Sequence, residues 1–217
     1  RGRSYHDSSE TNTSHFRRDY KLYLSKLILN PRSRLVQRDL SDIHMLHQTI
    51  MRAFTAIEPG RVLYRLEPRA DEMQVIVQSP NVPVWSLVEP NYFLKEPSYK
   101  MIELKLRTDQ KLQFRLRANP TVKSGGKREG IIREDEQLSW LERKGKSNGF
   151  EIVEARSYGQ RMEYGKGRDE NELRLFCTTF DGTLSVADPR KLIDAVENGI
   201  GSGKGFGNGL LSLARAE

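Results

Sequence analysis

Two histidines stand where acid/base chemistry could be carried out. His44 and His47 are three residues apart in a segment whose apolar residues recur at helical spacing. The positive end of a helix dipole disfavours protonation of an imidazole in the first turns, so both rings are expected to be neutral near pH 7. A neutral imidazole can act as a general base. A histidine bordering an apolar face can equally be a hydrogen-bonded structural residue, and the two histidines alone leave that alternative open.

Arg52 follows His47 by five residues on the same predicted helix. Its side chain is long enough to reach a phosphate, although it could also be a solvated surface residue. The segment contains no His-Glu-x-x-His pattern, and the chain has no Cys-x-x-Cys pair or carboxylate cluster. The sequence therefore predicts no metal site and no cofactor. The single cysteine, Cys177, is expected to be a small buried residue of a strand rather than a nucleophile.

A second unusual segment lies near the end of the chain, where every odd position from 199 to 209 is glycine. Glycine lets a backbone approach a phosphate closely, and Lys204 adds a positive charge. The order of a Walker A loop is absent, and no helix follows as a dinucleotide-binding motif requires. Apolar residues at 206, 210, 211 and 213 favour a folded loop over a linker. The glycines are Gly199, Gly201, Gly203, Gly205, Gly207 and Gly209.

The positive charge of the chain is concentrated in one stretch. The net charge is +7, and residues 95–128 contain ten Lys and Arg against three acidic residues, which accounts for the whole excess. Within this stretch, residues 102–107 and 111–117 alternate between apolar and mainly basic side chains. Such alternation predicts strands with one buried face and one basic, wet face, although incidental charge on a solvated face is the simpler alternative. An exposed basic loop is expected at 119–130.

The order of the predicted elements repeats. In chain order we expect a strand (22–29), a helix starting at Asp39 or Ser41 and ending near 57, two strands (61–67, 73–79), a short helix or turn (85–88) and the two alternating strands. A helix (135–146) then precedes two strands (149–157, 172–180), which are joined by a polar loop with Arg161, Lys166 and Arg168. A turn (181–182), a strand from 184 and a helix (188–198) follow. This order favours an α+β fold of two ferredoxin-like (RRM-like) βαββαβ domains, 22–110 and 111–217. Residues 1–21 are expected to be a disordered extension or the product of a misassigned start. No apolar run is long enough for a membrane span, and we expect a cytoplasmic protein.

Five segments together are similar to one known family. They are Tyr-Leu-Ser-Lys-Leu (23–27), Leu-His-Gln (46–48), Phe-Arg-Leu-Arg-Ala-Asn-Pro (114–120), Trp-Leu-Glu-Arg-Lys (140–144) and the glycine-rich segment through Leu213. This combination resembles the CasE family, the endoribonucleases that process CRISPR RNA in type I-E systems.

The resemblance implies two ferredoxin-like domains and metal-independent cleavage of CRISPR precursor RNA beside the repeat hairpin, leaving a 2′,3′-cyclic phosphate. It also implies that the product stays bound and that the other Cascade subunits are partners. By position, the catalytic histidine of the family falls on His47, an assisting basic residue on Arg52, and a tyrosine often found in the family on His44. The residues expected to contact the phosphates of the RNA stem are Arg115, Arg117, Lys123, Lys127, Arg128, Arg133 and Lys204.

Three other functions remain possible from the residues. The first is an RNA-binding protein of the same fold without catalysis. The second is a two-histidine phosphoesterase, because His47-Gln48-Thr49 matches its His-x-Thr element; the partner element would have to be His6-Asp7-Ser8. The third is a structural subunit whose glycine loop packs against partner proteins.

Overall fold

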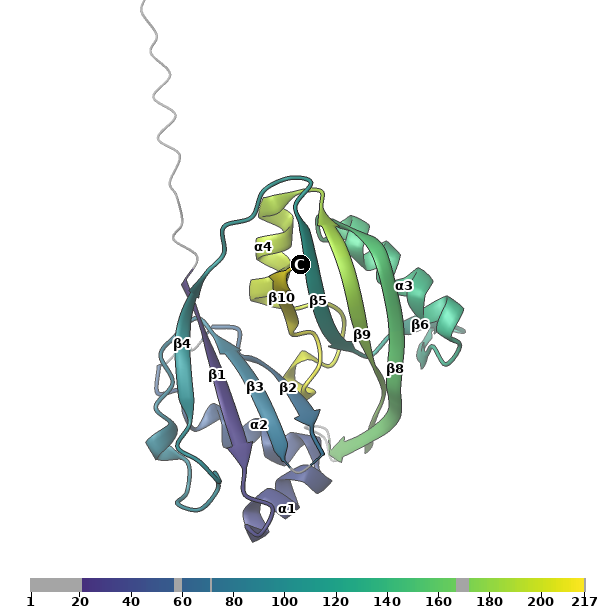
Figure 1. Cartoon of the computed structure of the whole chain (residues 1–217). Coiled ribbons are helices and arrows are strands. Elements are labelled where there is room, and N and C mark those ends of the chain that lie inside the picture. Colours follow the sequence, from purple (N-terminus) through teal and green to yellow (C-terminus); the bar gives the residue numbers. More distant parts are fainter. Residues whose placement is uncertain (1–20, 57–59, 71, 167–171, 217) are drawn as a thin grey trace, which may run out of the picture.

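Two four-stranded antiparallel sheets organise the protein (Figure 1). The computed structural model describes residues 21–56, 60–70, 72–166 and 172–216. The first sheet has the order β2-β3-β1-β4, and the second has the order β10-β5-β9-β8. The two orders match when the strands of each sheet are counted along the chain. In both sheets the third strand lies between the first and the second, and the fourth lies on the other side of the first. The strands are β1 (Lys21–Leu29), β2 (Leu63–Pro68), β3 (Met73–Ser79), β4 (Ser98–Glu103), β5 (Lys111–Ala118), β8 (Phe150–Lys166), β9 (Glu172–Val186) and β10 (Leu211–Arg215).

Where one helix was expected from Asp39 or Ser41 onward, the structure has two: α1 (Arg34–Ser41), most of which lies in the expected loop, and α2 (Ile43–Met51). Asp42 separates them, because its extended backbone ends α1 while its carboxylate accepts a hydrogen bond from the His44 amide and caps α2. The expectation of a loop before residue 39 and of a helix continuing to 57 was therefore wrong; residue 57 itself lies outside the described part of the chain. The short helix η1 (Trp85–Leu87) lies where it was expected.

Helices α3 (Glu134–Ser147) and α4 (Pro189–Asn198) pack on one face of the second sheet. Their residues Trp140, Leu141 and Leu192 join Leu116 and Phe180 of the strands in one buried core. Asp188 caps α4 by accepting from the amides of its first turn. The second half is thus an α+β unit with helices on one side of an antiparallel sheet.

The alternating pattern of residues 102–107 was only partly interpreted correctly. β4 ends at Glu103, and residues 104–107 lie outside any strand. Ile102, Leu104 and Leu106 nevertheless pack against the core of the second sheet. Their alternation therefore reflects packing of a connecting segment on the second half rather than a continuing strand.

Two strands of the second sheet are longer than predicted. β8 continues through Arg161 and Lys166, which were expected in a polar loop, and β9 runs without a turn through Asp181 and Gly182. Arg161 is part of the strand because it pairs with Cys177 of β9, and its side chain forms an ion pair with Glu163 two residues later. Residue 168 of the predicted loop lies outside the described residues.

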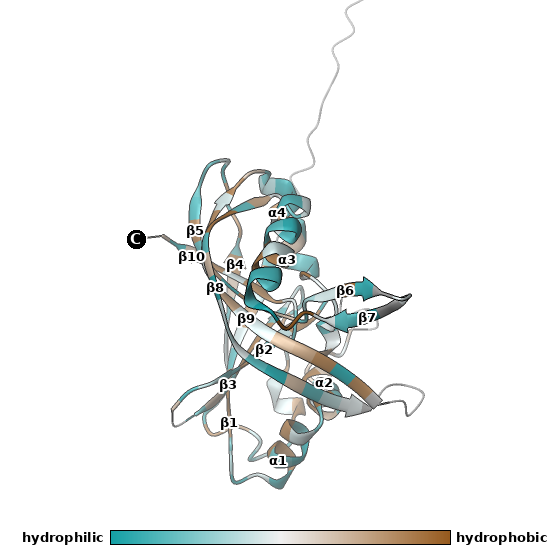
Figure 2. Ribbon diagram, turned by 90° about the vertical axis from the view of Figure 1, so that its right-hand side faces the viewer, coloured by the Kyte–Doolittle hydropathy of each residue, from teal (hydrophilic) through white to brown (hydrophobic). Residues whose placement is uncertain are grey.

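The predicted basic loop at 119–130 contains a small hairpin, β6 (Thr121–Ser124) and β7 (Lys127–Gly130). Gly125 and Gly126 form its turn, and both have positive φ, as two-residue hairpin turns require. Figure 2 shows this hairpin projecting away from the second sheet. Among the described residues, no helix is long and apolar enough to cross a membrane.

Candidate functional site

Helix α2 places the two histidines close to its positive end. The Asp42 cap puts His44 in the first turn and His47 one turn later. Leu46 and Ile50 are buried beneath the helix. The histidines are therefore held on a helix that is fixed to the first sheet.

The buried carboxylate of Asp39 holds α2 in place through a hydrogen bond from Thr49. Asp39 of α1 accepts hydrogen bonds from Thr49 Oγ1 at 2.6 Å and from the hydroxyl of Tyr92 at 2.8 Å. Arg38 donates to its second oxygen at 2.7 Å, so the buried charge is compensated. Because Thr49 lies two residues after His47, this network sets the position of the candidate catalytic turn.

The glycine-rich segment folds onto α2. Its short helix η2 (Lys204–Phe206) brings the Phe206 ring to 6.4 Å from the rings of both His44 and His47, measured between centroids. A Cβ added at Gly205 would lie 3.8 Å from Cε1 of His47. Five of the six glycines have positive φ, a conformation that other residues adopt at a cost. The two segments that the sequence singled out separately thus form one site.

Tyr64 of β2 completes the surroundings of His47. The two rings are stacked, with centroids 6.2 Å apart and an interplanar angle of 21°. The Tyr64 hydroxyl donates to the Gly205 carbonyl at 3.2 Å. Sequence analysis did not single out Tyr64, because a tyrosine in a predicted strand is ordinarily a core residue; only the pairing of distant segments reveals its place.

His47 is held in its neutral form. Burial, assisted by the nearby charge of His44, lowers the pKa of His47. Its Nδ1 atom is buried and has no hydrogen-bond partner within the described part of the chain. The ring as a whole is only partly buried, so a bound hydroxyl group can give a proton to the neutral imidazole only at its other nitrogen, Nε2.

His44 and Arg52 are both engaged by neighbours. Nε2 of His44 lies 2.9 Å from the side-chain nitrogen of Gln48. Arg52 caps the end of α2 and forms an exposed ion pair with Glu89. The structure thus brings His44 to Phe206 and His47, whereas Arg52 is paired away from them. An exposed ion pair is weak, at about 0–1 kcal/mol, so a phosphate could displace Glu89.

The residues expected to contact RNA fall into two groups. Lys123 and Arg128 are exposed and face one another across the β6–β7 hairpin, and Lys127 lies on β7. Arg133 precedes α3 and is exposed, with its guanidinium 2.8 Å from Asp135. Lys204 is partly buried on η2, and that burial, together with the charges of Arg61 and Lys144, lowers its pKa.

Arg115 and Arg117 are less accessible than predicted. The exposed positions of β5 do alternate up to Arg115, which forms a two-pronged ion pair with Asp181 at 2.7 Å. Arg117 was expected on the same wet face, but it is 6% exposed and donates to Glu163 at 2.7 Å. The far end of β8 covers this position, which the pattern within β5 does not reveal.

Cys177 is a buried thiol, as expected. It donates to Glu163 at 3.3 Å, and burial raises the pKa of the thiol to about 12. A thiol of this kind is a poor nucleophile at neutral pH.

Comparison with known proteins places the chain in a family. The model of a family described as "CRISPR associated protein" matches residues 22–215. The CRISPR-associated endoribonuclease Cse3 of Thermus thermophilus is 35% identical over 215 residues, covering 89% of this chain and 100% of the relative. The chain belongs to the Cse3/CasE family. The resemblance drawn from the five sequence segments is confirmed.

Other Cse3/CasE proteins agree with this assignment. The Cascade subunit CasE of Escherichia coli K12 is 33% identical over 214 residues, covering 89% of this chain and 99% of the relative. The structure of Thermus thermophilus Cse3 bound to an RNA representing a pre-cleavage complex has a TM-score of 0.81 at 34% identity, covering 90% of this chain and 100% of that one. The α+β architecture is therefore that of the Cse3/CasE family.

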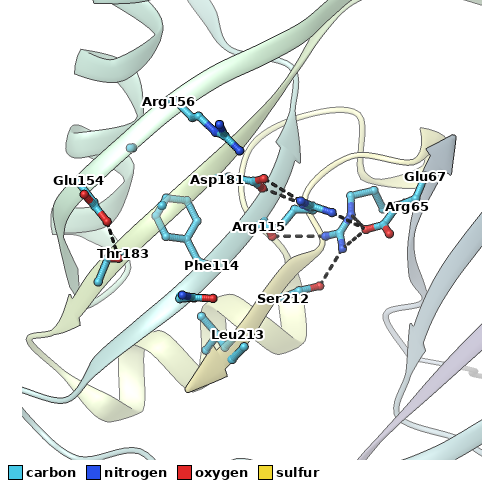
Figure 3. A pocket seen from close by; sticks show the side chains of 14 residues that line it. Arg65, Glu67, Phe114, Arg115, Glu154, Arg156, Asp181, Thr183, Ser212 and Leu213 are labelled. Atoms are coloured by element: carbon cyan, nitrogen blue, oxygen red, sulfur yellow. Dashed lines mark hydrogen bonds and ion pairs between the residues drawn. The ribbon is translucent and has the colours of Figure 1, made fainter. Parts of the chain in front are cut away.

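A cavity of about 640 Å³ lies over the second sheet next to β2, and its lining contains neither histidine (Figure 3). Arg65 reaches across from β2 and donates to Ser212 Oγ at 3.0 Å and to the Leu210 carbonyl at 3.1 Å, while pairing with Glu67 at 2.7 Å. These contacts join the two sheets.

Metal binding has no obvious basis in the parts of this Cse3/CasE chain that the structure describes. Within them, no three His, Cys, Asp or Glu side chains are grouped closely enough to hold an ion.

Proposed function

We propose that this member of the Cse3/CasE family cleaves CRISPR precursor RNA at the repeat hairpin without a metal ion and stays bound to its product as a subunit of Cascade. The observation that carries the proposal is the position of His47, whose pKa is lowered by burial and whose partly exposed ring lies against the glycine-rich segment. The RNA-bound Thermus thermophilus relative and the Escherichia coli Cascade subunit support the substrate and the partner.

The reaction requires only proton transfer and stabilisation of charge. His47 removes the proton of a ribose 2′-hydroxyl, and the 2′-oxygen attacks the adjacent phosphorus. The bond to the 5′-oxygen of the next nucleotide breaks, and that oxygen takes up a proton. The products are a 2′,3′-cyclic phosphate and a 5′-hydroxyl, so no water is consumed.

The other site residues assist in ways that their positions support. His44 orients the RNA or shares the proton transfer, since it lies beside Phe206 near His47. Arg52, released from Glu89, and Lys204 of η2 stabilise the negative charge that develops on the phosphate.

The basic residues hold the stem. An A-form RNA stem is recognised mainly through its shape and its phosphates. Lys123, Lys127 and Arg128 of the hairpin and Arg133 before α3 contact these phosphates. Arg115 and Arg117 take part once RNA competes with Asp181 and Glu163 for their charges.

We also propose that the two halves, 22–110 and 111–217, are ferredoxin-like domains. The matching strand orders of the two sheets and the α3 and α4 helices of the second half support this assignment. In the first half, the short η1 takes the place of the second helix.

Replacement of His47 tests the proposal. His47→Ala should reduce cleavage of a cognate repeat hairpin by roughly 10²–10⁴-fold, the contribution of general base catalysis, and leave hairpin affinity within a few-fold. Gln37→Ala, at an exposed position of the neighbouring helix α1, is the matched control. Wild-type protein should cut equally well in EDTA and leave a cyclic phosphate. Undiminished cutting by His47→Ala would exclude the assigned base, and tight hairpin binding by wild-type protein without any cutting would indicate an RNA-binding protein instead.

A further inference from the structure

A second cavity lies beside the candidate active site, between α2, β2, η2 and the far end of β8. Its volume is about 250 Å³. This is smaller than the roughly 300–1,000 Å³ of pockets that hold drug-sized ligands. A cavity of this size is suited to a single ring system and is too small for a peptide or a stem of paired RNA.

The outer wall of the cavity comes from the second sheet. β5 pairs with β9 only as far as Thr178, whereas β8 and β9 remain paired with each other from Arg161 and Cys177 onward. We call residues 161–166 and 172–177 the β8–β9 arm. The arm reaches α2, because a Cβ at Gly165 would lie 2.7 Å from Cγ1 of Ile43 (Figure 1). Glycine at this position allows the arm to close against the helix.

The inner wall is shared with the histidines. Tyr64 stacks on His47 and also lines the cavity, and Phe206 lies 6.4 Å from His47 and lines it as well. Ile43 and Leu46, which immediately precede the two histidines, line it too. A group bound in the cavity is therefore separated from His47 by no more than one ring.

The lining has the chemistry that proteins use to hold unpaired bases. Tyr164 is 53% exposed, and Arg161 presents a half-exposed guanidinium. Aromatic rings and guanidinium planes stack on splayed RNA bases. Arg117 and Arg161 supply two positive charges against the one negative charge of the buried Glu163. Asp39, the other carboxylate of the lining, is already paired with Arg38, so the lining can accept the phosphate that accompanies a base.

We infer that this cavity binds one unpaired nucleobase of the RNA, from a nucleotide directly flanking the cleaved phosphate. The inference rests on the proposed function. Holding the base beside Tyr64 and Phe206 draws its nucleotide out of the stack and aligns the 2′-hydroxyl with the phosphorus next to His47. Alignment of this kind is a major source of rate in intramolecular attack. Arg161 and Tyr164 thereby determine which nucleotide is presented for cleavage.

The test compares abasic RNA hairpins in the full-length protein and its variants. Each hairpin carries a 2′-deoxyribose at the attacking position, so that binding is measured without cleavage. One version keeps all its bases, one lacks the base before the cleaved phosphate, and one lacks the base after it. Dissociation constants are measured for wild-type protein, Tyr164→Ala and Arg161→Ala. Tyr99→Ala, a similarly exposed tyrosine of β4 on the first sheet, is the control.

One of the abasic hairpins should bind wild-type protein and Tyr99→Ala roughly 10-fold more weakly, the loss expected for one stacked base. The same hairpin should lose less than about 2-fold in Tyr164→Ala, since the stacking partner is already gone. Equal losses in wild-type protein and Tyr164→Ala, or no loss for either abasic hairpin, would overturn the inference. Cleavage of the all-ribose hairpin by wild-type protein would then leave the proposed function standing. If the wild-type protein binds none of the hairpins, both the inference and the proposed function are contradicted.

Discussion

Gly205 lies directly against the imidazole of His47, with room for one methyl group and no more. The ideal Cβ position at Gly205 is 3.8 Å from Cε1 of His47, an ordinary contact distance, and φ there is not positive. At Gly207, two residues later, φ is +77° and the Cβ position is 3.2 Å from Cε2 of Tyr64. The two glycines therefore serve different purposes.

Alanine should accordingly be tolerated at one of these positions and not at the other. Gly205→Ala should keep cleavage within about 3-fold, because neither the backbone nor the ring has to move. Gly207→Ala should lower the free energy of unfolding by about 1–2 kcal/mol, the cost of a left-handed alanine, and displace Tyr64 from His47. Urea unfolding and single-turnover cleavage check both variants. Equal behaviour of the two alanines would contradict this account of the loop.

The pH dependence of cleavage should report the lowered pKa of His47. A general base works when it is neutral, so kcat/KM should rise with pH through the pKa of His47 and then level off, and because burial lowers that pKa the rise should lie at lower pH than for an ordinary histidine. His44→Asn removes a charge that contributes to the lowering, so the rising part of the profile should move to higher pH. An unchanged profile would show that the charge of His44 does not act on His47.

Arg52 should matter for the chemical step more than for binding. Arg52→Ala should reduce kcat roughly 100-fold, in the range seen when a group that stabilises developing charge is removed. Arg52→Lys should recover most of the loss. Glu89→Gln, which frees Arg52 from its ion pair, should preserve kcat and improve RNA affinity modestly. If Arg52→Ala keeps the wild-type kcat, Arg52 is a solvated surface residue with no part in the chemical step.

The β6–β7 hairpin should determine the salt dependence of RNA binding. Lys123→Ala and Arg128→Ala should each weaken binding and reduce the slope of log K against log salt by about 1, the value for one phosphate contact. Lys100→Ala is the matched control, because Lys100 is an exposed lysine of β4 within the same basic stretch of sequence. A similar change in slope for Lys100→Ala would mean that the positive charge of the whole stretch attracts RNA and that the hairpin makes no specific phosphate contacts.

The junction between the sheets should depend on Arg65. Arg65→Ala leaves the mostly buried Glu67 without its main partner and should lower the free energy of unfolding by about 3 kcal/mol. Arg65→Met combined with Glu67→Gln should recover much of this loss, since no buried charge remains unpaired. Denaturant unfolding measures both. A larger loss in the double variant would show that the contacts of Arg65 with β10, rather than its charge, hold the junction.

The sequence was most informative where a pattern is local. Alternating residues such as Leu112, Phe114 and Leu116 predict a strand with one buried face, because side chains of a strand point to opposite sides in turn. The family resemblance likewise rested on short segments. His47 and the glycine-rich segment were both recognised as unusual for reasons that need no structure.

Other features depend on contacts that no local pattern contains. Asp39, Ser41 and Asp42 are all residues that can cap a helix, so the start of α2 was placed too early and α1 was expected to be a loop. Arg161 and Glu163 resemble loop residues until their mutual ion pair is seen within β8. Arg117 was predicted to be exposed because the strand that covers it lies far away in the sequence. The contact between His47 and Gly205 joins two short helices that are far apart in the sequence, and only the folded structure brings them together.

That contact also determines when the site around His47 is complete. Helix α2 is synthesised early, whereas Gly205 and Phe206, which form a wall of its site, follow more than 150 residues later. Domains fold as units during synthesis, the N-terminal one first, at about 5–20 residues per second. A nascent chain with a folded first half therefore carries His47 but not its enclosure. The second half therefore has to be synthesised and folded before His47 is enclosed.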